Sequence, residues 1–368
     1  MLNFTFWVFI VFITIQFIYY LFIFVPFSFS KTEKTNSGNY PISVIVCAKN
    51  EAENVKKFIP VLAAQNYSNF EIVLIDDASN DETLDIFEEF EKTYTNIRLV
   101  KVANNEAFWG NKKFALTLGI KASKNEYLLF TDADCYPTSP NWIFEMSACF
   151  TTQKTIVLGY SGFEKIAGSF LNKLVRFENL FSSMQYLSFA KLGKPYQGNG
   201  RNLAFKKSEF FRTNGYINHI KIRSGADTLF VNEASNKENT TFCISENSFV
   251  KSKPKTTFAS WFDLKRRNAV TAKKFTFFDK LQLTLFLVSQ VLVISLSIIL
   301  FSWLYQWQIV AALLSIRYLV AWLSFGYAAI KFNEKQLVYW FPIIEIALLF
   351  VQVNVAVSTL FSKPSQWK

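Results

Sequence analysis

The chain has 368 residues, of which 51% are apolar, and it contains 41 phenylalanines. This composition is too apolar for an ordinary soluble enzyme and predicts membrane spans. The formal net charge of +11 at pH 7 suits an anionic lipid surface or a phosphorylated ligand, whereas no recognition motif supports nucleic acid as a partner.

The first 30 residues contain no charged side chain. Within them, the run FTFWVFIVFITIQFIYYLFIFVPF is long enough to cross a bilayer core of about 30 Å as a helix. A cleavable signal peptide would have a basic start, a shorter apolar run and a small-residue cleavage site, and this segment has none of them. We therefore expect residues 1–30 to form an uncleaved membrane anchor.

Residues 31–280 carry most of the charged side chains and alternate between strand-like and helix-like patterns. Strands are predicted at 42–46, at 72–75, at 97–102 and in YLLFTDADC at 127–135. Helices are predicted at 51–64, from about residue 81, and in NKKFALTLGIKAS at 111–123. Strands that alternate with helices imply a mainly parallel, doubly wound α/β sheet, in which ligands bind at the carboxyl ends of the strands.

Polar clusters follow three of these strands, at Lys49–Glu51, Asp76–Asp77 and Asp132–Asp134. Aspartate is a poor strand former and is costly to bury without a partner charge. A capped turn explains one such cluster, but three clusters at the same edge of a sheet favour a ligand site. A hard divalent cation that holds a phosphorylated substrate would use oxygen ligands of this kind.

Two segments after Pro140 have helical patterns. The stretch SFLNKLVRFENLFSSMQYLSFAKL at 169–192 places an apolar stripe at helical spacing, formed by Phe170, Leu174, Phe177, Phe181, Met184 and Leu187. Such a helix either faces the protein core or lies on the membrane interface. The stretch SWFDLKRRNAVTAKKFTFF at 260–278 mixes aromatic and basic side chains and favours an interfacial helix.

Three further spans are predicted near 281–304, 309–330 and 337–360. Arg317 and Glu345 lie within these apolar segments, where they pair across helices or mark a polar path. Extension of the long Arg317 side chain to the interface is the alternative. The four cysteines have no metal-like spacing and are expected to be reduced thiols in a cytosol-facing domain.

The ordered set of motifs resembles the inverting family 2 glycosyltransferases, which have the nucleotide-sugar-binding GT-A fold. The matching stretches, in order, are SVIVCAKNEAENV, IDDASNDET, NKKFALTLGI, FTDADC, GNGRNLAF, SGADTLF and a basic stretch before the membrane. They fall within residues 41–275. The flanking apolar segments resemble those of the membrane-integrated bacterial members, which build cell-surface glycans or glycolipids.

The stretch TDADC is similar to the family's DXD signature. The resemblance implies that Asp134 is the main ligand of Mg²⁺ or Mn²⁺, and that Asp132 shares this metal or holds the ribose. Such a cation prefers oxygen ligands and can bridge a carboxylate and a diphosphate. His219, the one histidine of the chain, is either a late metal ligand or a surface or hinge residue.

The resemblance also implies a nucleotide pocket at the sheet edge. Asp77 would contact the base, while Cys47, Lys49 and Glu51 would line the pocket, and a UDP-sugar is the favoured donor. Lys112 would offer a cation to the diphosphate, the alternative being a solvated helix lysine.

The acceptor is expected on the side of GNGRNLAF and of the basic stretch. Gly198, Asn199 and Gly200 belong to a segment with little side-chain bulk, which lets an acceptor approach closely. A turn before a strand at 203–205 is the alternative. Arg267, in LKRRN, is expected on the same side.

The family usually carries an acidic pair or triple before LF, and one Asp of this group removes the proton of the acceptor hydroxyl. The corresponding stretch here is SGADTLF, in which only Asp227 is acidic. Asp227 is therefore the expected general base, although a shift of one residue would put the base at Ala226. If the base is absent, the protein is slow, substrate-assisted or catalytically inactive.

Processive relatives carry Gln-x-x-Arg-Trp near the membrane, where it holds the growing polymer. The matching LKRRN keeps Arg267 but has Leu264 and Asn268 at the other two positions. The leading hypothesis is thus a non-processive, multi-pass inner-membrane glycosyltransferase with its catalytic domain in the cytoplasm. It would move a sugar from a nucleotide sugar to a lipid-linked or cell-envelope glycan acceptor. The alternatives are a processive polysaccharide synthase and a catalytically impaired nucleotide-binding membrane scaffold.

The expected organisation follows from these segments. It comprises an anchor at 1–30, a GT-A domain at 31–255, a basic interfacial helix at 256–280 and transmembrane helices at 281–368.

Overall fold

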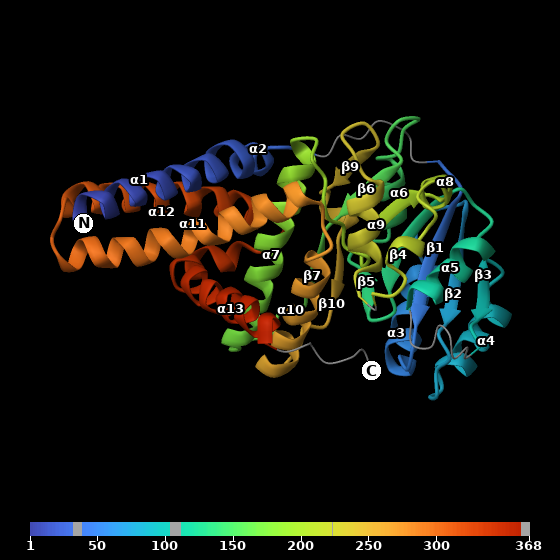
Figure 1. Cartoon of the computed structure of the whole chain (residues 1–368). Coiled ribbons are helices and arrows are strands. Elements are labelled where there is room, and N and C mark those ends of the chain that lie inside the picture. Colours follow the sequence, from blue (N-terminus) through green and yellow to red (C-terminus); the bar gives the residue numbers. More distant parts are fainter. Residues whose placement is uncertain (32–38, 104–111, 223, 362–368) are drawn as a thin grey trace.

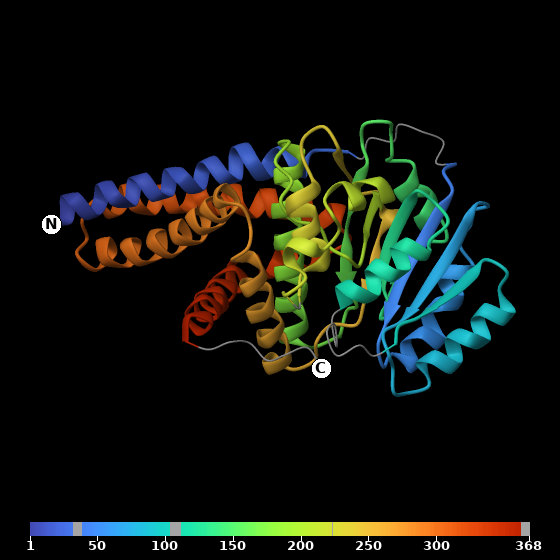
Figure 2. The same ribbon diagram turned by 45° about the vertical axis from the view of Figure 1, so that its right-hand side comes forward.

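The long apolar helices and the α/β domain lie at opposite ends of the molecule, and helix α7 (Phe170–Lys191) stands between them (Figures 1 and 2). The computed structural model describes residues 1–31, 39–103, 112–222 and 224–361. The N-terminus lies at the end of the apolar helices that is remote from the sheets (Figure 1).

The α/β domain is built on a seven-stranded sheet with the order β3-β2-β1-β4-β8-β6-β9. Its strands are β1 (Ile42–Ala48), β2 (Phe70–Asp76), β3 (Ile97–Lys101), β4 (Tyr127–Asp132), β6 (Ile156–Gly159), β8 (Leu203–Lys206) and β9 (Thr240–Cys243). Strand β8 runs antiparallel to both of its neighbours, and the other pairs are parallel. A smaller sheet has the order β5-β10-β7 and consists of β5 (Cys135–Pro137), β7 (Ser161–Phe163) and β10 (Val250–Ser252).

Helices cover both faces of the large sheet. All seven residues of β1 are buried, as expected for a central strand of a doubly wound sheet. One face packs against α3 (Ala52–Ala63), α4 (Thr83–Thr93) and α6 (Trp142–Ser147), and the other against α5 (Lys112–Ala122), α7 and α9 (Ala226–Ala234). Shorter elements are α8 (Lys207–Arg212), η2 (Ile217–His219) and η3 (Glu246–Ser248). The predicted fold class, a mainly parallel GT-A-type α/β sheet flanked by apolar helices, is confirmed.

The strand register brings the predicted polar clusters to one edge of the sheet. Cys47 near the end of β1 pairs with Ile75 of β2 on one side and with Asp132 of β4 on the other. Ala48 pairs with Asp76, so Asp77 follows immediately beyond that edge. The carboxyl ends of the three strands therefore coincide.

The apolar stripe of α7 faces the protein core. Ser169 begins the helix, and its hydroxyl accepts a hydrogen bond from the backbone N–H of Asn172. The stripe residues that are buried are Leu174, Phe177, Phe181, Met184 and Leu187, whereas Phe170 in the first turn is 45% exposed. The core-facing interpretation therefore holds for most of the stripe, because both the sheet and the apolar helices pack on α7.

Four helical segments in the described part of the chain are long and apolar enough to cross a membrane. The first is continuous from α1 (Leu2–Ile18) through a π-helical turn η1 (Tyr19–Phe24) to α2 (Val25–Ser28). The others are α11 (Phe277–Ser302), α12 (Trp307–Lys331), and η4 (Lys335–Trp340) continued by α13 (Phe341–Phe361). Helix α10 (Phe258–Ala272) precedes α11, so residues 277–280 belong to α11, the first C-terminal apolar helix, and not to the predicted interfacial helix.

The turn between α12 and η4 rests on the α/β domain. Asn333 donates a hydrogen bond of 2.6 Å from Nδ2 to Oε1 of Glu246. Glu334 forms a buried ion pair with Arg176 of α7. This turn, part of the sequence KFNEKQ, therefore lies on the same side of the apolar helices as the α/β domain.

Arg317 and Glu345 form a buried bidentate ion pair between α12 and α13. The guanidinium Nη1 lies 2.9 Å from Oε2 of Glu345, and Nη2 lies 2.6 Å from Oε1. Arg317 also donates from Nε to the side chain of Gln16 in α1, which in turn donates to Ser289 of α11. Extension of Arg317 to the interface is therefore wrong, and pairing across helices is the observed arrangement.

We predict that Glu345→Gln destabilises the protein by about 3–5 kcal/mol, because it leaves the Arg317 charge buried without its partner. The double change Arg317→Met with Glu345→Leu should recover much of this loss, since neither member of the pair is then left as an unpaired buried charge. Thermal unfolding of the detergent-purified chain, followed by circular dichroism, measures both.

The matched control is Glu88→Gln, which breaks the exposed pair between Lys101 and Glu88 and is expected to leave the unfolding midpoint unchanged. A Glu345→Gln protein that unfolds at the wild-type temperature would show that the buried pair does not hold the helices together.

Candidate functional site

Two cavities meet at the carboxyl edge of the large sheet. Cavity A has a volume of about 230 Å³ and is lined by residues that include Cys47, Lys112, Lys113 and Tyr216. Cavity B has a volume of about 350 Å³ and is lined by residues that include Asp134, Asn199, Arg201 and Lys265. The two share six lining residues, namely Asp132, Gly225, Asp227, Leu264, Arg267 and Asn268. One ligand can therefore extend from one cavity into the other.

Nine of the twelve residues predicted for the site line these cavities. They are Cys47, Lys112, Asp132, Asp134, Gly198, Asn199, Gly200, Asp227 and Arg267. The other three, Lys49, Glu51 and Asp77, lie at the same sheet edge but line neither cavity. The backbone N–H of Asp77 donates to the carbonyl of Ala48, which joins the ends of β2 and β1.

The end of β4 gathers a group of possible metal ligands. One ligand atom each from Asp132, Asp134 and Cys135 lies within 4.8 Å of the others. The Cys135 thiol donates to Oδ1 of Asp134 at 3.3 Å, and burial together with the Asp134 carboxylate raises the pKa of this thiol well above its ordinary value. A neutral thiol is a poor ligand for Mg²⁺ or Mn²⁺, so the two carboxylates are the residues that fit a hard cation.

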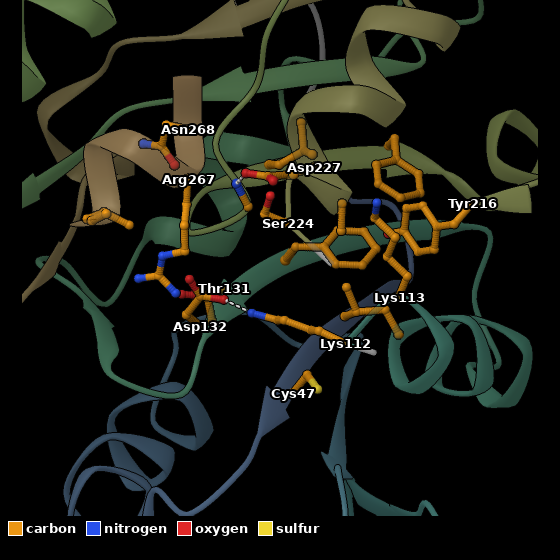
Figure 3. Close-up of a pocket in the computed structure, with 18 residues that line it drawn as sticks. Cys47, Lys112, Lys113, Thr131, Asp132, Tyr216, Ser224, Asp227, Arg267 and Asn268 are labelled. Atoms are coloured by element: carbon orange, nitrogen blue, oxygen red, sulfur yellow. Dashed lines mark hydrogen bonds and ion pairs between the residues drawn. The ribbon is translucent and has the colours of Figure 1, made fainter. Parts of the chain in front are cut away.

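Asp132 is bound to Lys112 across the mouth of cavity A (Figure 3). The Lys112 ammonium lies 2.5 Å from Oδ1 of Asp132, and both side chains are about a third exposed. Burial raises the pKa of Asp132, but the Lys112 charge outweighs it, and the pKa lies below its ordinary value. Arg267 points toward this pair from the opposite wall (Figure 3). The positive charge of Lys112 is therefore partly neutralised before any ligand binds.

Residues at the ends of β1 and β2 contribute neutral or protonatable groups to the carboxyl edge of the sheet. Burial raises the pKa of the Cys47 thiol to about 12, so this side chain is neutral near pH 7. Burial also raises the pKa of Asp77, although Lys49 opposes this shift. Glu51 accepts a hydrogen bond of 2.6 Å from Nδ2 of Asn54, while its backbone N–H donates to Oγ1 of Thr83. These contacts fix the turn between β1 and α3 beside the cavities.

Asp227 is in the first turn of α9 and faces both cavities. Its Oδ2 accepts a hydrogen bond of 2.5 Å from the backbone N–H of Gly200 (Figure 3). The next residue, Thr228, donates from Oγ1 to the carbonyl of Gly198 at 3.3 Å. The start of α9 therefore holds the GNGRN segment in place through two consecutive side chains.

Two glycines pack closely around Asp227, and a side chain is excluded most clearly at Gly225. Gly225 has a φ of +68°, and a Cβ there would lie 2.2 Å from Cγ2 of Thr271 in α10. A Cβ on Gly200 would lie 3.2 Å from the Asp227 carboxylate. Ala226, between Gly225 and Asp227, lines cavity A but not cavity B, so a carboxylate at this position would face a different part of the site.

Two cations at the site were not predicted from the sequence. Lys113 is buried, and its ammonium donates to the carbonyls of His219 and Ile222 at 2.8 and 2.7 Å. Arg201 donates to Asn179 and to Ser252, both at 3.0 Å, and lies over the Phe163 ring. Lys113 directly follows the predicted residue Lys112 in NKK, and Arg201 directly follows Gly200 in GNGR. This adjacency is the one sequence signal that could have identified them.

His219 is buried in the η2 turn, so the interpretation as a surface residue is wrong. It is not part of the metal-ligand group found among the described residues. Burial and the nearby Lys113 ammonium lower the pKa of His219 to about 4. The ring packs beside Tyr216, which lines cavity A, and Nε2 lies 3.8 Å from the Glu233 carboxylate.

Residues 43–212 match the family described as Glycosyl transferase family 2. Among curated relatives, the chain is 32% identical over 98 residues to glycosyltransferase AglE of Haloferax volcanii, a match that covers 26% of this chain and 31% of that protein. It is 27% identical over 205 residues to 4,4'-diaponeurosporenoate glycosyltransferase of Staphylococcus haemolyticus, which covers 52% of this chain and 50% of the relative. The chain thus spans a third to a half of the length of these relatives.

Among solved structures, the chain is similar to the mannosyltransferase PcManGT of Pyrobaculum calidifontis, in complex with GDP-Man and Mn²⁺. The TM-score is 0.56, the identity is 15%, and the match covers 95% of this chain and 98% of that one. At this identity the similarity concerns the fold, and it includes the apolar helices as well as the α/β domain.

We predict that acidification destabilises the protein through His219. The folded pKa of about 4 lies below the ordinary value of about 6.5, so the unfolded chain binds more protons between these values. Stability is therefore lost as the pH falls from about 6.5 toward 4, by about 2–3 kcal/mol in total. His219→Gln should remove this contribution and flatten the decline.

Thermal unfolding midpoints at pH 7 and pH 4.5 measure the effect. Asn218→Gln, one residue away, is the control and should behave like the wild type. Equal acid sensitivity of His219→Gln and the wild type would contradict the prediction.

Proposed function

We propose that the protein is a membrane-bound inverting glycosyltransferase, because residues 43–212 match the model of glycosyltransferase family 2. It moves a sugar from a nucleotide sugar, with a UDP-sugar favoured, to a lipid-linked or cell-envelope glycan acceptor. The four apolar helices and the turn that returns to the α/β domain support a multi-pass inner-membrane protein with a cytoplasmic catalytic domain.

The proposal rests on the observation that carboxylates from two separate elements line cavity B. Asp132 and Asp134 enter it from the end of β4, and Asp227 enters it from the start of α9. A displacement at the anomeric carbon needs a base on one side of the sugar and a stabilised leaving group on the other. In the proposed reaction, α9 supplies the base, and the end of β4 supplies the groups that stabilise the leaving group.

In the proposed reaction, Asp227 accepts the proton of the acceptor hydroxyl. The acceptor oxygen forms a bond to the anomeric carbon as the bond from this carbon to the diphosphate breaks, and the nucleoside diphosphate leaves with the bonding electrons. Attack opposite to the leaving group inverts the anomeric configuration. The backbone N–H of Gly200 fixes Oδ2 of Asp227, so the proton goes to Oδ1.

The charge of the departing diphosphate is neutralised from the β4 side. Asp134, with Asp132, would hold a divalent Mg²⁺ or Mn²⁺, and such a cation supplies Lewis-acid stabilisation of the leaving group. The presence of Mn²⁺ and GDP-Man in a structure of similar fold supports this choice. Cys47, Lys49, Glu51 and Asp77 would contact the nucleoside, and Lys112 would contact the diphosphate once it leaves Asp132.

The scaffold alternative rests on Ala226, which stands where relatives often carry an acid. The position of Asp227 in both cavities favours the enzyme instead, because a carboxylate already faces the site. The processive alternative is disfavoured by Leu264 and Asn268, which line both cavities in place of the Gln and Trp of processive relatives.

We predict that Asp134→Ala abolishes metal-dependent binding of the nucleotide sugar while leaving the fold intact, because a main oxygen ligand is lost. Isothermal titration of UDP-sugars with and without Mn²⁺ measures this, and circular dichroism checks the fold. Asp263→Ala, an acid on the surface of α10, is the control. Unchanged metal-dependent affinity in Asp134→Ala would sink the metal assignment.

The decisive experiment for the function concerns Asp227. Purified protein is incubated with Mn²⁺, a panel of nucleotide sugars and a native lipid extract, and diphosphate release and mass-shifted lipids are followed. Asp227→Asn should lower turnover by about 10²–10⁴, the usual contribution of a positioned acid–base group. Donor affinity should be unchanged, which marks an interaction made in the transition state.

The change Ala226→Asp tests the register. If it accelerates turnover while Asp227→Asn is silent, the base belongs at position 226 and the natural protein works with an impaired base. If no variant and no wild-type sample turns over any donor, the scaffold interpretation replaces the enzyme.

A further inference from the structure

A third cavity, the lateral groove, lies between α7, α10, α11 and α13 and has a volume of about 260 Å³. Its apolar wall includes Phe181, Leu283, Phe286, Leu348, Val351 and Val355. Two of its four helices, α11 and α13, belong to segments that can cross a membrane. In Figure 1, α13 diverges from α1, α11 and α12, which run side by side. The groove therefore borders two of the segments that can cross a membrane.

The lateral groove adjoins cavity B. Glu178, Trp261 and Lys265 line both spaces. Glu178 of α7 and Lys265 of α10 form an ion pair with side chains that are 13% and 20% exposed. This pair lines both cavities, so the lateral groove and cavity B share a wall.

The chemistry of the walls changes at this boundary. Beyond it, cavity B is lined by five cations, namely Arg201, Lys253, Lys255, Lys265 and Arg267, and by four carboxylates. The indole N–H of Trp261 is buried at the boundary and has no hydrogen-bond acceptor among the described residues. An amphiphile would thus find apolar contacts on one side and cations with an unused donor on the other.

We propose that the lateral groove binds the hydrocarbon chain of the acceptor, and that the acceptor is a lipid whose phosphate-bearing head group lies in cavity B. The inference rests on the proposed function, because it assigns cavity B to the transfer reaction. Lys253 and Lys255 precede α10, are exposed, and line cavity B alone, which places two cations beside the head group.

The test uses the full chain in detergent and a synthetic polyprenyl phosphate with a diazirine at its chain end. Ultraviolet cross-links, mapped by mass spectrometry, are expected on groove residues of α11 and α13. Ala356→Trp fills the groove from α13 and should lower the cross-linking yield by about tenfold, which corresponds to loss of roughly two methylene contacts. Ala312→Trp, at an exposed alanine of α12 outside the groove, is the matched control and should leave the yield unchanged.

The head group is tested with the corresponding polyprenol, which lacks the phosphate. The phosphate probe should bind more tightly than the alcohol, and Lys253→Gln with Lys255→Gln should narrow this difference, although three other cations still line cavity B. Equal binding of alcohol and phosphate would overturn the head-group assignment. Cross-links spread over all four apolar helices, or equal losses in Ala356→Trp and Ala312→Trp, would overturn the groove.

These readouts do not depend on turnover. Nucleotide affinity, measured in the same variants, should be unchanged by either tryptophan. A protein that cross-links the probe in the groove but never transfers a sugar would refute the proposed function and leave lipid binding standing. A protein that transfers sugar to a short water-soluble acceptor but does not bind the probe would support the proposed function and refute lipid binding in the groove.

Discussion

The arrangement of the four apolar helices depends on the ion pair between Arg317 and Glu345. A charged side chain among apolar helices is costly unless it is paired, so α12 and α13 are stable only where these two groups meet. The same network takes in Gln16 of α1 and, through it, Ser289 of α11. Hydrophobic burial between such helices is weakly directional, and this polar network fixes their rotation about one another.

Helix α7 connects the apolar helices to the candidate site. The turn after α12 is bound to α7 by the buried ion pair between Glu334 and Arg176. Other side chains of α7 pack in one hydrophobic core with the large sheet. Helix α7 also carries Glu178, whose ion pair with Lys265 positions α10. Cavity B lies between these helices and the sheet edge, so its position relative to the apolar helices depends on α7 and α10.

The sequence was most informative where structure is local. The strands at 42–46 and 72–75, the first part of the strand predicted at 127–135, and their polar ends could be predicted, because a buried parallel strand is a continuous apolar run and its carboxyl end has a known place in the sheet. The prediction at 127–135 was too long, since β4 ends at Asp132 and Cys135 begins β5. The sequence left two questions open: whether Arg317 pairs across helices, and whether the apolar stripe of α7 faces the core or the membrane interface. Both depend on which elements, distant in the sequence, pack against these residues. Lys112 and Asp132 were each predicted, but their mutual ion pair was not. The burial of Lys113 and His219 depends on carbonyls and walls contributed by the 216–222 segment, which no periodicity reveals.

Asp227 connects the start of α9 to the GNGRN segment. The family usually has more than one acid before LF, whereas Asp227 is the single acid of this stretch. Its Oδ2 accepts a hydrogen bond from the backbone N–H of Gly200, and the residue lines both cavities. Any shift of GNGRN therefore moves the Asp227 carboxylate, which we propose as the general base, and Gly225, with its positive φ and its close approach to Thr271, ties the same turn to α10. Because α10 also lines the lateral groove, the proposed acceptor site and the turn that carries Asp227 share this helix.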